Sequence, residues 1–179
     1  MIHFHIYTIE SDIKSKSKEL LNCNLKHYLN TDSFVINYSD NGKPTTDGLF
    51  FSISHCNNKL VQAFTTQGEI GIDVEYKNSK RKFRSLAKRY FHLKEYQLIQ
   101  RLDEVEAKNC FYQLWTVKEA ICKAQGGRLW YYLHDNYVDK DKKIVTCKHQ
   151  FNIMYLNAID QYCLAIAMAD KQDVTIHHA

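Results

Sequence analysis

Gly71-Ile72-Asp73-Val74-Glu75 is the stretch around which the rest of the chain is organised. Side chains alternate between the two faces of an extended strand, so Asp73 and Glu75 share one face while Ile72 and Val74 point into a core. Two carboxylates about 6–7 Å apart on one face can share a hard cation. Gly71 lets another backbone or a ligand approach closely. An acidic pair of this kind is more often a solvated face, so a metal site needs support from elsewhere in the chain.

That support comes from a helical pattern over residues 111–125, which ends at Gly126-Gly127. The apolar positions recur at helical spacing: Phe111, Leu114, Trp115 and Cys122. Glu119 and Lys123 are four residues apart and project from one face of this helix. The pair forms either a surface salt bridge or a metal ligand one turn before an ammonium that binds phosphate.

Four motifs follow one another along the chain: Asn41-Gly42-Lys43-Pro44, Phe51-Ser52-Ile53-Ser54-His55, the 71–75 stretch, and Trp115-x-x-Lys118-Glu119-Ala120-x-x-Lys123-Ala124-x-Gly126. This ordered set resembles the 4'-phosphopantetheinyl transferase superfamily, of the surfactin-synthetase-activating type. The resemblance extends from about the first helix to the last strand. Each motif alone is weak, but their order and spacing together are specific.

The resemblance implies an α+β fold, a pseudo-twofold repeat of two similar α/β halves with the site at the interface between them. The chain would divide into residues 1–75, which hold the Ser-His and Asp-x-Glu motifs, and residues 76–179, which hold the signature helix. The two halves would form one compact unit.

The resemblance also implies a reaction: transfer of the 4'-phosphopantetheine arm of coenzyme A to a serine of an apo acyl or peptidyl carrier protein, releasing adenosine 3',5'-bisphosphate. Mg²⁺ would be the cofactor, held by Asp73, Glu75 and Glu119, since it prefers oxygen ligands and shares carboxylates with substrate phosphates. Glu119 and Lys123 would be catalytic, Glu119 as ligand, as base, or as both.

The same resemblance assigns contacts with coenzyme A, the donor substrate. Ser54 and His55 would end a strand facing the cleft and bind its phosphates, with Lys123 on the pyrophosphate and Lys43 at the nucleotide end. Lys118 either reaches the pantetheine phosphate or pairs with a nearby carboxylate. Larger members carry a basic stretch before the first helix, where this chain offers only Lys14, Lys16 and Lys18.

Composition suits a globular protein: 179 residues, of which 45% are hydrophobic and 13% aromatic. No apolar run is long enough to span a membrane and no secretory leader is recognisable, so we expect a cytoplasmic protein, as a monomer. The six cysteines include no Cys-x-x-Cys pair and are expected to be reduced. The net charge of +4 is mildly basic.

The positive charge is concentrated in residues 77–89, which carry seven Lys and Arg. Such a run is either a solvated face or a docking surface for an acidic partner. By resemblance, the carrier protein would dock near residues 77–96.

Periodicity predicts the remaining elements. Strands are expected at 2–8, 34–38, 50–54, 60–65, 137–138, 144–147, 150–156, 162–168 and 172–176, and helices at 13–29 and from 92 to about 102. Residues 103–106 read as an acidic linker, and the chain after Gly127 as strands only.

Two other functions compete with the transferase. The chain is alternatively a catalytically inactive carrier-binding module of the same fold, which the short N-terminal segment favours and the intact acidic residues oppose. The last alternative is a basic nucleic-acid-binding protein that uses the 77–89 segment, and the absence of a nucleic-acid motif opposes it.

Overall fold

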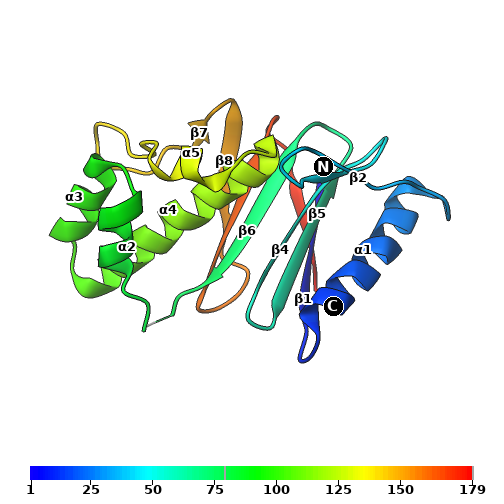
Figure 1. Cartoon of the computed structure of the whole chain (residues 1–179), viewed down its shortest axis with the longest axis horizontal. Coiled ribbons are helices and arrows are strands. Elements are labelled where there is room, and N and C mark those ends of the chain that lie inside the picture. The colour runs from blue at the N-terminus through cyan, green and yellow to red at the C-terminus, as the bar shows by residue number, and fades with distance from the viewer. Residues whose placement is uncertain (79, 179) are drawn as a thin grey trace.

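Two four-stranded sheets form the centre of the part of the chain that the computed structural model describes, residues 1–78 and 80–178 (Figure 1). The strand order is β10-β1-β5-β4 in one sheet and β6-β9-β8-β7 in the other, and β2 and β3 form a separate ribbon. The fold is therefore mixed α+β, as expected.

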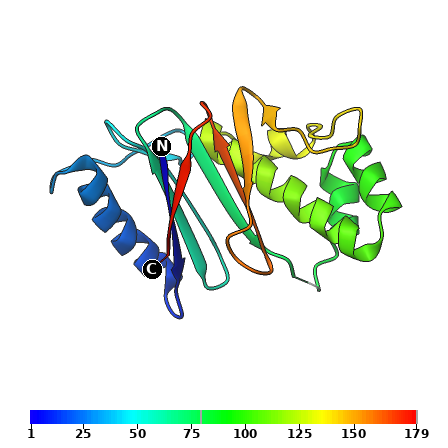
Figure 2. The same ribbon diagram turned by 180° about the vertical axis from the view of Figure 1, so that it is seen from behind.

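The strands have the following bounds: β1 Ile2–Thr8, β2 Asn37–Tyr38, β3 Pro44–Thr45, β4 Phe50–Cys56, β5 Lys59–Thr65, β6 Ile70–Tyr76, β7 Cys147–Lys148, β8 Phe151–Leu156, β9 Tyr162–Met168 and β10 Val174–His178. All neighbouring pairs are antiparallel except β1 and β10, which are parallel and lie side by side in Figure 2. In each sheet, the strand that precedes the helices pairs with the second strand of the hairpin that follows them.

The helices are α1 Ile13–Leu29, α2 Phe83–Tyr90, α3 Leu93–Arg101, α4 Glu104–Gln125 and α5 Leu129–Leu133. The signature helix α4 begins where the Asp103 carboxylate accepts the Glu106 N–H, and it ends at Gly126 in a left-handed conformation. None of the helices among the described residues is both long and apolar enough to cross a membrane.

Three apolar clusters hold the layers together. The inner cluster lies between the two sheets and takes Ile72 and Val74 from β6, with Phe4 from β1 and Ile166 from β9. One outer cluster packs α1 on the first sheet, and the other packs α2 to α5 on the second. The inward direction of Ile72 and Val74 leaves Gly71, Asp73 and Glu75 on the face that α4 covers, as the alternation predicted.

Side chains tie the two sheets where β4 runs alongside β6. The hydroxyls of Ser52 and Ser54 accept the N–H groups of Ile72 at 3.0 Å and Val74 at 3.3 Å, and the Cys56 thiol accepts the N–H of Tyr76 at 3.3 Å. We call these contacts the β4–β6 seam. The seam brings the end of β4 next to the carboxylates of β6.

The structure corrects four predictions of secondary structure. Residues 104–106 are not a linker but the first turn of α4, where their acidic side chains favour the positive end of the helix dipole. Helix α5 was not predicted, and only residues 37–38 of the 34–38 segment form a strand. Between 137 and 147, the extended stretches make an isolated bridge and the short strand β7.

Candidate active site

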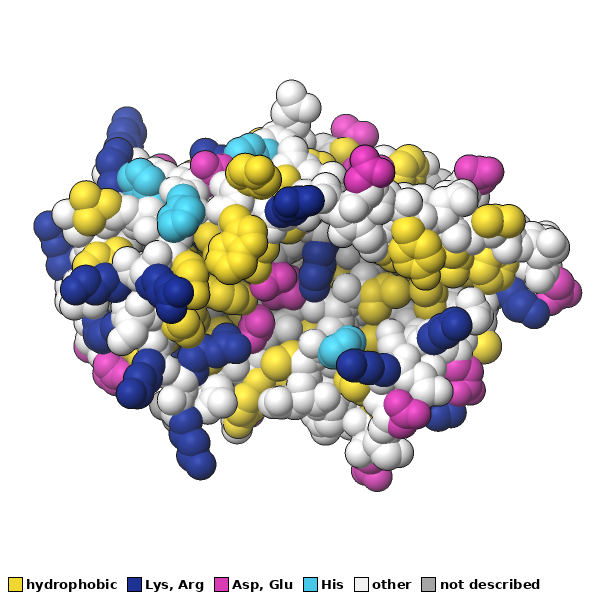
Figure 3. Space-filling model, in the orientation of Figure 1, with side chains coloured by type: hydrophobic (Ala, Val, Ile, Leu, Met, Phe, Trp, Pro, Cys, Tyr) yellow, Lys and Arg dark blue, Asp and Glu magenta, His cyan; other side chains and the backbone are white. Residues whose placement is uncertain are grey.

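Asp73 and Lys123 meet at the centre of the candidate site. The Lys123 ammonium lies 2.8 Å from Asp73 Oδ1 and 2.8 Å from Ser54 Oγ, and the Ser54 hydroxyl donates to the same Asp73 oxygen at 2.9 Å. Asp73 is buried, and its other carboxylate oxygen, Oδ2, has no hydrogen-bond partner among the described residues. In Figure 3, a hollow that contains acidic and basic side chains opens on this face of the molecule.

Gly71 explains how α4 comes close enough to place its side chains against β6. A Cβ atom at this position would lie 2.0 Å from the Ala120 carbonyl oxygen and 2.3 Å from the Ala124 nitrogen. Only glycine therefore allows the α4 backbone to rest on the strand, as the sequence predicted. The resulting contact places Glu119 and Lys123 over the acidic face of β6.

Glu119 is a half-buried carboxyl in this cluster. Burial raises its pKa to about 7, and the negative charges of Asp73 and Glu75 add to the rise while Lys123 opposes it. A carboxyl with a pKa near 7 exchanges protons readily at neutral pH.

Glu75 faces a different cation. Its carboxylate pairs with the Arg81 guanidinium at 3.1 Å, and that group also lies 5.5 Å from the ring centroid of Tyr112 and 5.9 Å from that of Trp115. Burial raises the pKa of Glu75, and the charge of Asp73 raises it further. This pairing was not predicted, although the basic segment that contains Arg81 directly follows Glu75.

The three carboxylates suit Mg²⁺ in chemistry but are not gathered around one point. Among residues 1–78 and 80–178, no three His, Cys, Asp or Glu side chains are arranged to hold a metal ion as they stand. Asp73, Glu75 and Glu119 nevertheless offer the oxygen donors that Mg²⁺ prefers. A cation would also satisfy the unpartnered Asp73 Oδ2, since a buried carboxylate oxygen without a partner is unfavourable. The residues present therefore fit the ion.

Ser54 and His55 point to opposite faces of β4, because neighbouring side chains of a strand alternate. This corrects the expectation that both face one cleft. The Ser54 hydroxyl donates to Asp73 and accepts from Lys123 and the Val74 N–H, which uses its full hydrogen-bonding capacity. The His55 side chain is exposed.

Lys43 lies beside the site, with its ammonium bonded to the Glu69 carboxylate and to the Ala124 carbonyl near the end of α4. It lines a cavity of about 270 Å³ together with Lys123 and Cys122. The remaining lining comes from the 41–44 turn, from residues 51–53 of β4 and from Gly126-Gly127. Three of the four sequence motifs thus contribute to one cavity.

Lys118 does not contribute to this cluster. Its side chain is completely buried and pairs with the Glu95 carboxylate at 3.0 Å. Burial lowers the pKa of Lys118 to about 8, against the opposing effect of Glu95. The structure therefore corrects the assignment of Lys118 to coenzyme A and supports the other role considered for it, pairing with a carboxylate.

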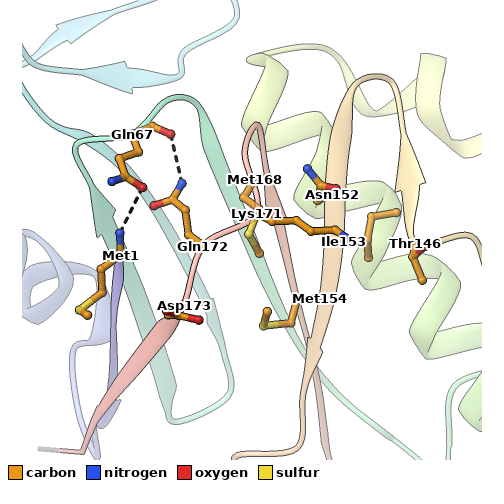
Figure 4. Close-up of a pocket in the computed structure, with 10 residues that line it drawn as sticks. All are labelled: Met1, Gln67, Thr146, Asn152, Ile153, Met154, Met168, Lys171, Gln172 and Asp173. Atoms are coloured by element: carbon orange, nitrogen blue, oxygen red, sulfur yellow. Dashed lines mark hydrogen bonds between the residues drawn. The ribbon is translucent and has the colours of Figure 1, made fainter.

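A larger cavity lies elsewhere, between the ends of the two sheets (Figure 4). It measures about 710 Å³ and is lined by Met1, Gln67, Thr146, Asn152, Ile153, Met154, Met168, Lys171, Gln172 and Asp173. None of the predicted site residues lines it. Its charged side chains, Lys171 and Asp173, make no cluster comparable to that around Asp73.

Comparison with known proteins finds relatives that are all named as 4'-phosphopantetheinyl transferases. Over 95 residues, the chain is 38% identical to the 4'-phosphopantetheinyl transferase HetI of Nostoc sp., a segment that covers 50% of this chain and 40% of HetI. It is 31% identical over 109 residues to AcpT of Escherichia coli K12, covering 59% and 55% of the two chains. It is 38% identical over 88 residues to Sfp of Bacillus subtilis, covering 48% and 38%.

The matched segment therefore spans between 38% and 55% of the length of these relatives. A family profile described as the 4'-phosphopantetheinyl transferase superfamily matches residues 69–167, which is more than half of this chain and includes β6, α4 and nearly all of β9. The residues that meet at Asp73 and Lys123 lie within this match, apart from Ser54. The chain belongs to the 4'-phosphopantetheinyl transferase superfamily.

Proposed function

We propose that this chain transfers the 4'-phosphopantetheine arm of coenzyme A to a serine hydroxyl of an apo acyl or peptidyl carrier protein in an Mg²⁺-dependent reaction. The products would be the holo carrier and adenosine 3',5'-bisphosphate. The observation that carries the proposal is the contact of Asp73 with Lys123, with Glu119 beside them at a pKa raised to about 7. HetI, AcpT and Sfp are each named as transferases of this kind.

Asp73, Glu75 and Glu119 would hold the Mg²⁺ ion, which when bound neutralises the negative charge of the pyrophosphate. Lys123 supplies a positive charge at the same place and binds the pyrophosphate oxygens once it leaves Asp73. His55 is exposed and free to contact a phosphate, whereas Ser54 acts by holding Asp73 and Lys123. The cavity next to Lys43 and Lys123 accommodates part of the nucleotide.

Glu119 accepts the proton of the attacking serine hydroxyl, directly or through a water molecule. The serine oxygen forms a bond to the phosphorus on the pantetheine side, and the bond from that phosphorus to the oxygen of adenosine 3',5'-bisphosphate breaks. A carboxyl with a pKa near 7 is suited to this task, since it is a stronger base than an exposed glutamate and is still largely ionised at pH 7.5.

We further propose that the carrier docks near residues 77–96, where basic side chains gather around α2 and α3 in Figure 3. The repeated order of strand, helices and hairpin supports a pseudo-twofold relation, with a division near 75–76 and the site at its interface. Strand β6 would then lie at the boundary, since it pairs with β9 and adjoins β4 through the seam. A cytoplasmic monomer that serves fatty-acid or secondary-metabolite synthesis completes the proposal.

Mass spectrometry tests the reaction. Apo acyl carrier protein incubated with this chain, coenzyme A and Mg²⁺ is expected to gain the mass of one phosphopantetheine arm, and EDTA should prevent the gain. Asp73→Ala and Glu119→Ala should each lower the transfer rate by at least about a hundredfold while circular dichroism shows an intact fold. Activity near the wild-type rate in either folded variant would contradict the assignment of these residues.

The competing function is an inactive carrier-binding module of the same fold. Binding of several carriers without any mass gain would favour it. The nucleic-acid alternative predicts binding to DNA of any sequence, with an affinity that falls steeply as salt increases. The purified chain used for mass spectrometry can be tested for this binding.

A further inference from the structure

All hydrogen-bond donors of the Lys118 ammonium have acceptors inside the protein. Its three N–H donors face four acceptors: the Glu95 carboxylate at 3.0 Å and the carbonyl oxygens of Tyr132, Leu133 and Asp135. The side chain has no exposed surface. No donor is left for a phosphate, so a contact with coenzyme A would require this network to break.

Both carboxylate oxygens of Glu95 also accept hydrogen bonds inside the protein. One carboxylate oxygen accepts the N–H of Tyr137 at 2.7 Å, and the other accepts the N–H of His92 at 3.2 Å in the capping box that begins α3. Glu95 has no exposed surface either. The carboxylate thus joins the start of α3 to the chain after α5.

The pair connects three elements around one point. Lys118 belongs to α4, Glu95 to α3, and the carbonyl groups to the end of α5 and the turn after it. The last carbonyls of a helix have no partner within the helix, and Lys118 supplies donors to them. The rings of Tyr137 and Phe91 enclose the ammonium at 4.3 Å and 5.2 Å from their centroids.

We infer that Lys118 and Glu95 are positioning residues that fix α3 and α5 against α4, and thereby hold the carrier-docking segment in register with Glu119. The inference rests on the proposed function, because it assigns the docking segment to residues 77–96. Glu95 lies in that segment, and Lys118 immediately precedes Glu119 on α4. The donor site is not touched by either residue.

The test uses two variants of the full chain. Lys118→Met removes the cation and leaves the Glu95 carboxylate buried without it, so the melting temperature is expected to fall by roughly 10 °C. In Lys118→Met/Glu95→Gln the buried charge is gone and the amide oxygen still accepts the Tyr137 N–H, but the amide NH2 cannot accept the His92 N–H, so part of that loss is recovered. Lys108→Met, on the same helix but partly exposed, is the matched control.

The folded double variant then separates positioning from phosphate binding. The Kd for coenzyme A with Mg²⁺, measured by calorimetry, is expected to stay within about twofold of wild type, while the carrier KM rises about fivefold at little change in kcat. A tenfold weaker Kd for coenzyme A would overturn the inference in favour of a phosphate contact. An unchanged carrier KM would overturn it as well, by reducing the pair to a purely stabilising role.

Failure of the proposed function gives a different result. If the wild-type chain transfers nothing, the melting temperatures and the coenzyme A Kd still decide between an internal role and a phosphate contact for Lys118. Binding of an apo acyl carrier protein, measured without turnover, then replaces the KM.

Discussion

Each of three acidic side chains in or near the site is paired with a cation from another part of the chain. Asp73 pairs with Lys123, Glu75 with Arg81, and the buried Glu95 with Lys118. Glu119 has no such partner among the ion pairs of the described residues, and its pKa is raised to about 7. Burial without an ion-pair partner therefore distinguishes Glu119 from the paired carboxylates, and the charges of Asp73 and Glu75 add to the effect.

The raised pKa of Glu119 predicts a pH dependence of stability. An unfolded glutamate titrates near its ordinary value of 4.5 and the folded one near 7, so the folded state binds more protons between these values. The free energy of unfolding should therefore fall as pH rises through this window, and the contribution of Glu119 is complete only below about pH 4.5. Glu119→Gln should make the profile flatter between pH 5 and pH 7.5 in urea unfolding.

Glu106→Gln is the matched control, since Glu106 lies exposed in the first turn of the same helix. Its profile should follow the wild type. A Glu119→Gln profile as steep as the wild type would show that the folded carboxyl titrates near its ordinary value.

The sequence predicted the acidic side chains of the site better than their partners. Strand alternation placed Asp73 and Glu75 on one face, and helical spacing placed Glu119 and Lys123 together. Arg81 and Glu95 were not identified as partners, because an ion pair set by the three-dimensional fold leaves no periodic signal in either segment. Lys118 was misassigned for the same reason, since its motif gives its position on α4 but not the acceptors that surround it.

At the scale of the elements, the contact between β6 and α4 depends on a missing side chain. Gly71→Ala would place Cβ 2.0 Å from the Ala120 carbonyl oxygen, which is backbone and cannot move without shifting the whole helix. We expect the free energy of unfolding to fall by about 3 kcal/mol or more. Urea unfolding followed by circular dichroism measures the loss.

Gly127→Ala provides a comparison of the same chemical change. There the new Cβ meets the outer end of the Tyr132 side chain, which can move more easily than a helix backbone. A smaller loss is expected. If the two variants lost equal amounts of stability, the α4 backbone could shift away from β6 at little cost. That result would contradict the argument from the close approach at Gly71.

The β4–β6 seam supports a second prediction for an element contact. Ser52→Ala removes the acceptor of the Ile72 N–H, which lies in a buried residue. The stability loss should be about 1–3 kcal/mol. Ser85→Ala, at an exposed position of α2, should change stability by less than about 0.5 kcal/mol, and a similar small effect at Ser52 would argue against the seam.

Long periodic segments were predicted well because their pattern reflects burial on one face. Strand β9 was expected to be central from its continuous apolar run, and it pairs with strands on both sides. Helix α5 has only five residues, too few to show a period, and no element was expected between Gly127 and residue 137. Residues 103–106 looked like a linker because a cap and a first turn share the polar composition of loops.

Over the whole molecule, the positive charge around α2 and α3 serves two separate purposes. The Arg84 guanidinium donates to the carbonyl oxygens of Ile99 at 2.6 Å and Leu102 at 3.1 Å, so this side chain caps the C-terminal end of α3. Lys88 is exposed and has no ion pair among the described residues. Only cations of the second kind are available to a docking partner.

Lys88→Glu is therefore expected to raise the KM for an acidic carrier by about three- to tenfold at low salt and less at high salt, with the Kd for coenzyme A unchanged. Steady-state kinetics at two salt concentrations measure the effect. Lys171→Glu introduces the same charge change at the rim of the large cavity in Figure 4 and should leave the carrier KM alone. Equal effects of the two variants would indicate dependence on net charge rather than docking.

The β4–β6 seam has a consequence for how such a protein can diversify. Within each sheet the ladder is made of backbone groups, which no amino-acid replacement removes except proline. Between the sheets, three ties along β6 depend on the side chains at positions 52, 54 and 56. A single amino-acid replacement at one of these positions can thus remove or alter one hydrogen bond between the sheets, while the backbone hydrogen bonds within each sheet stay as they are.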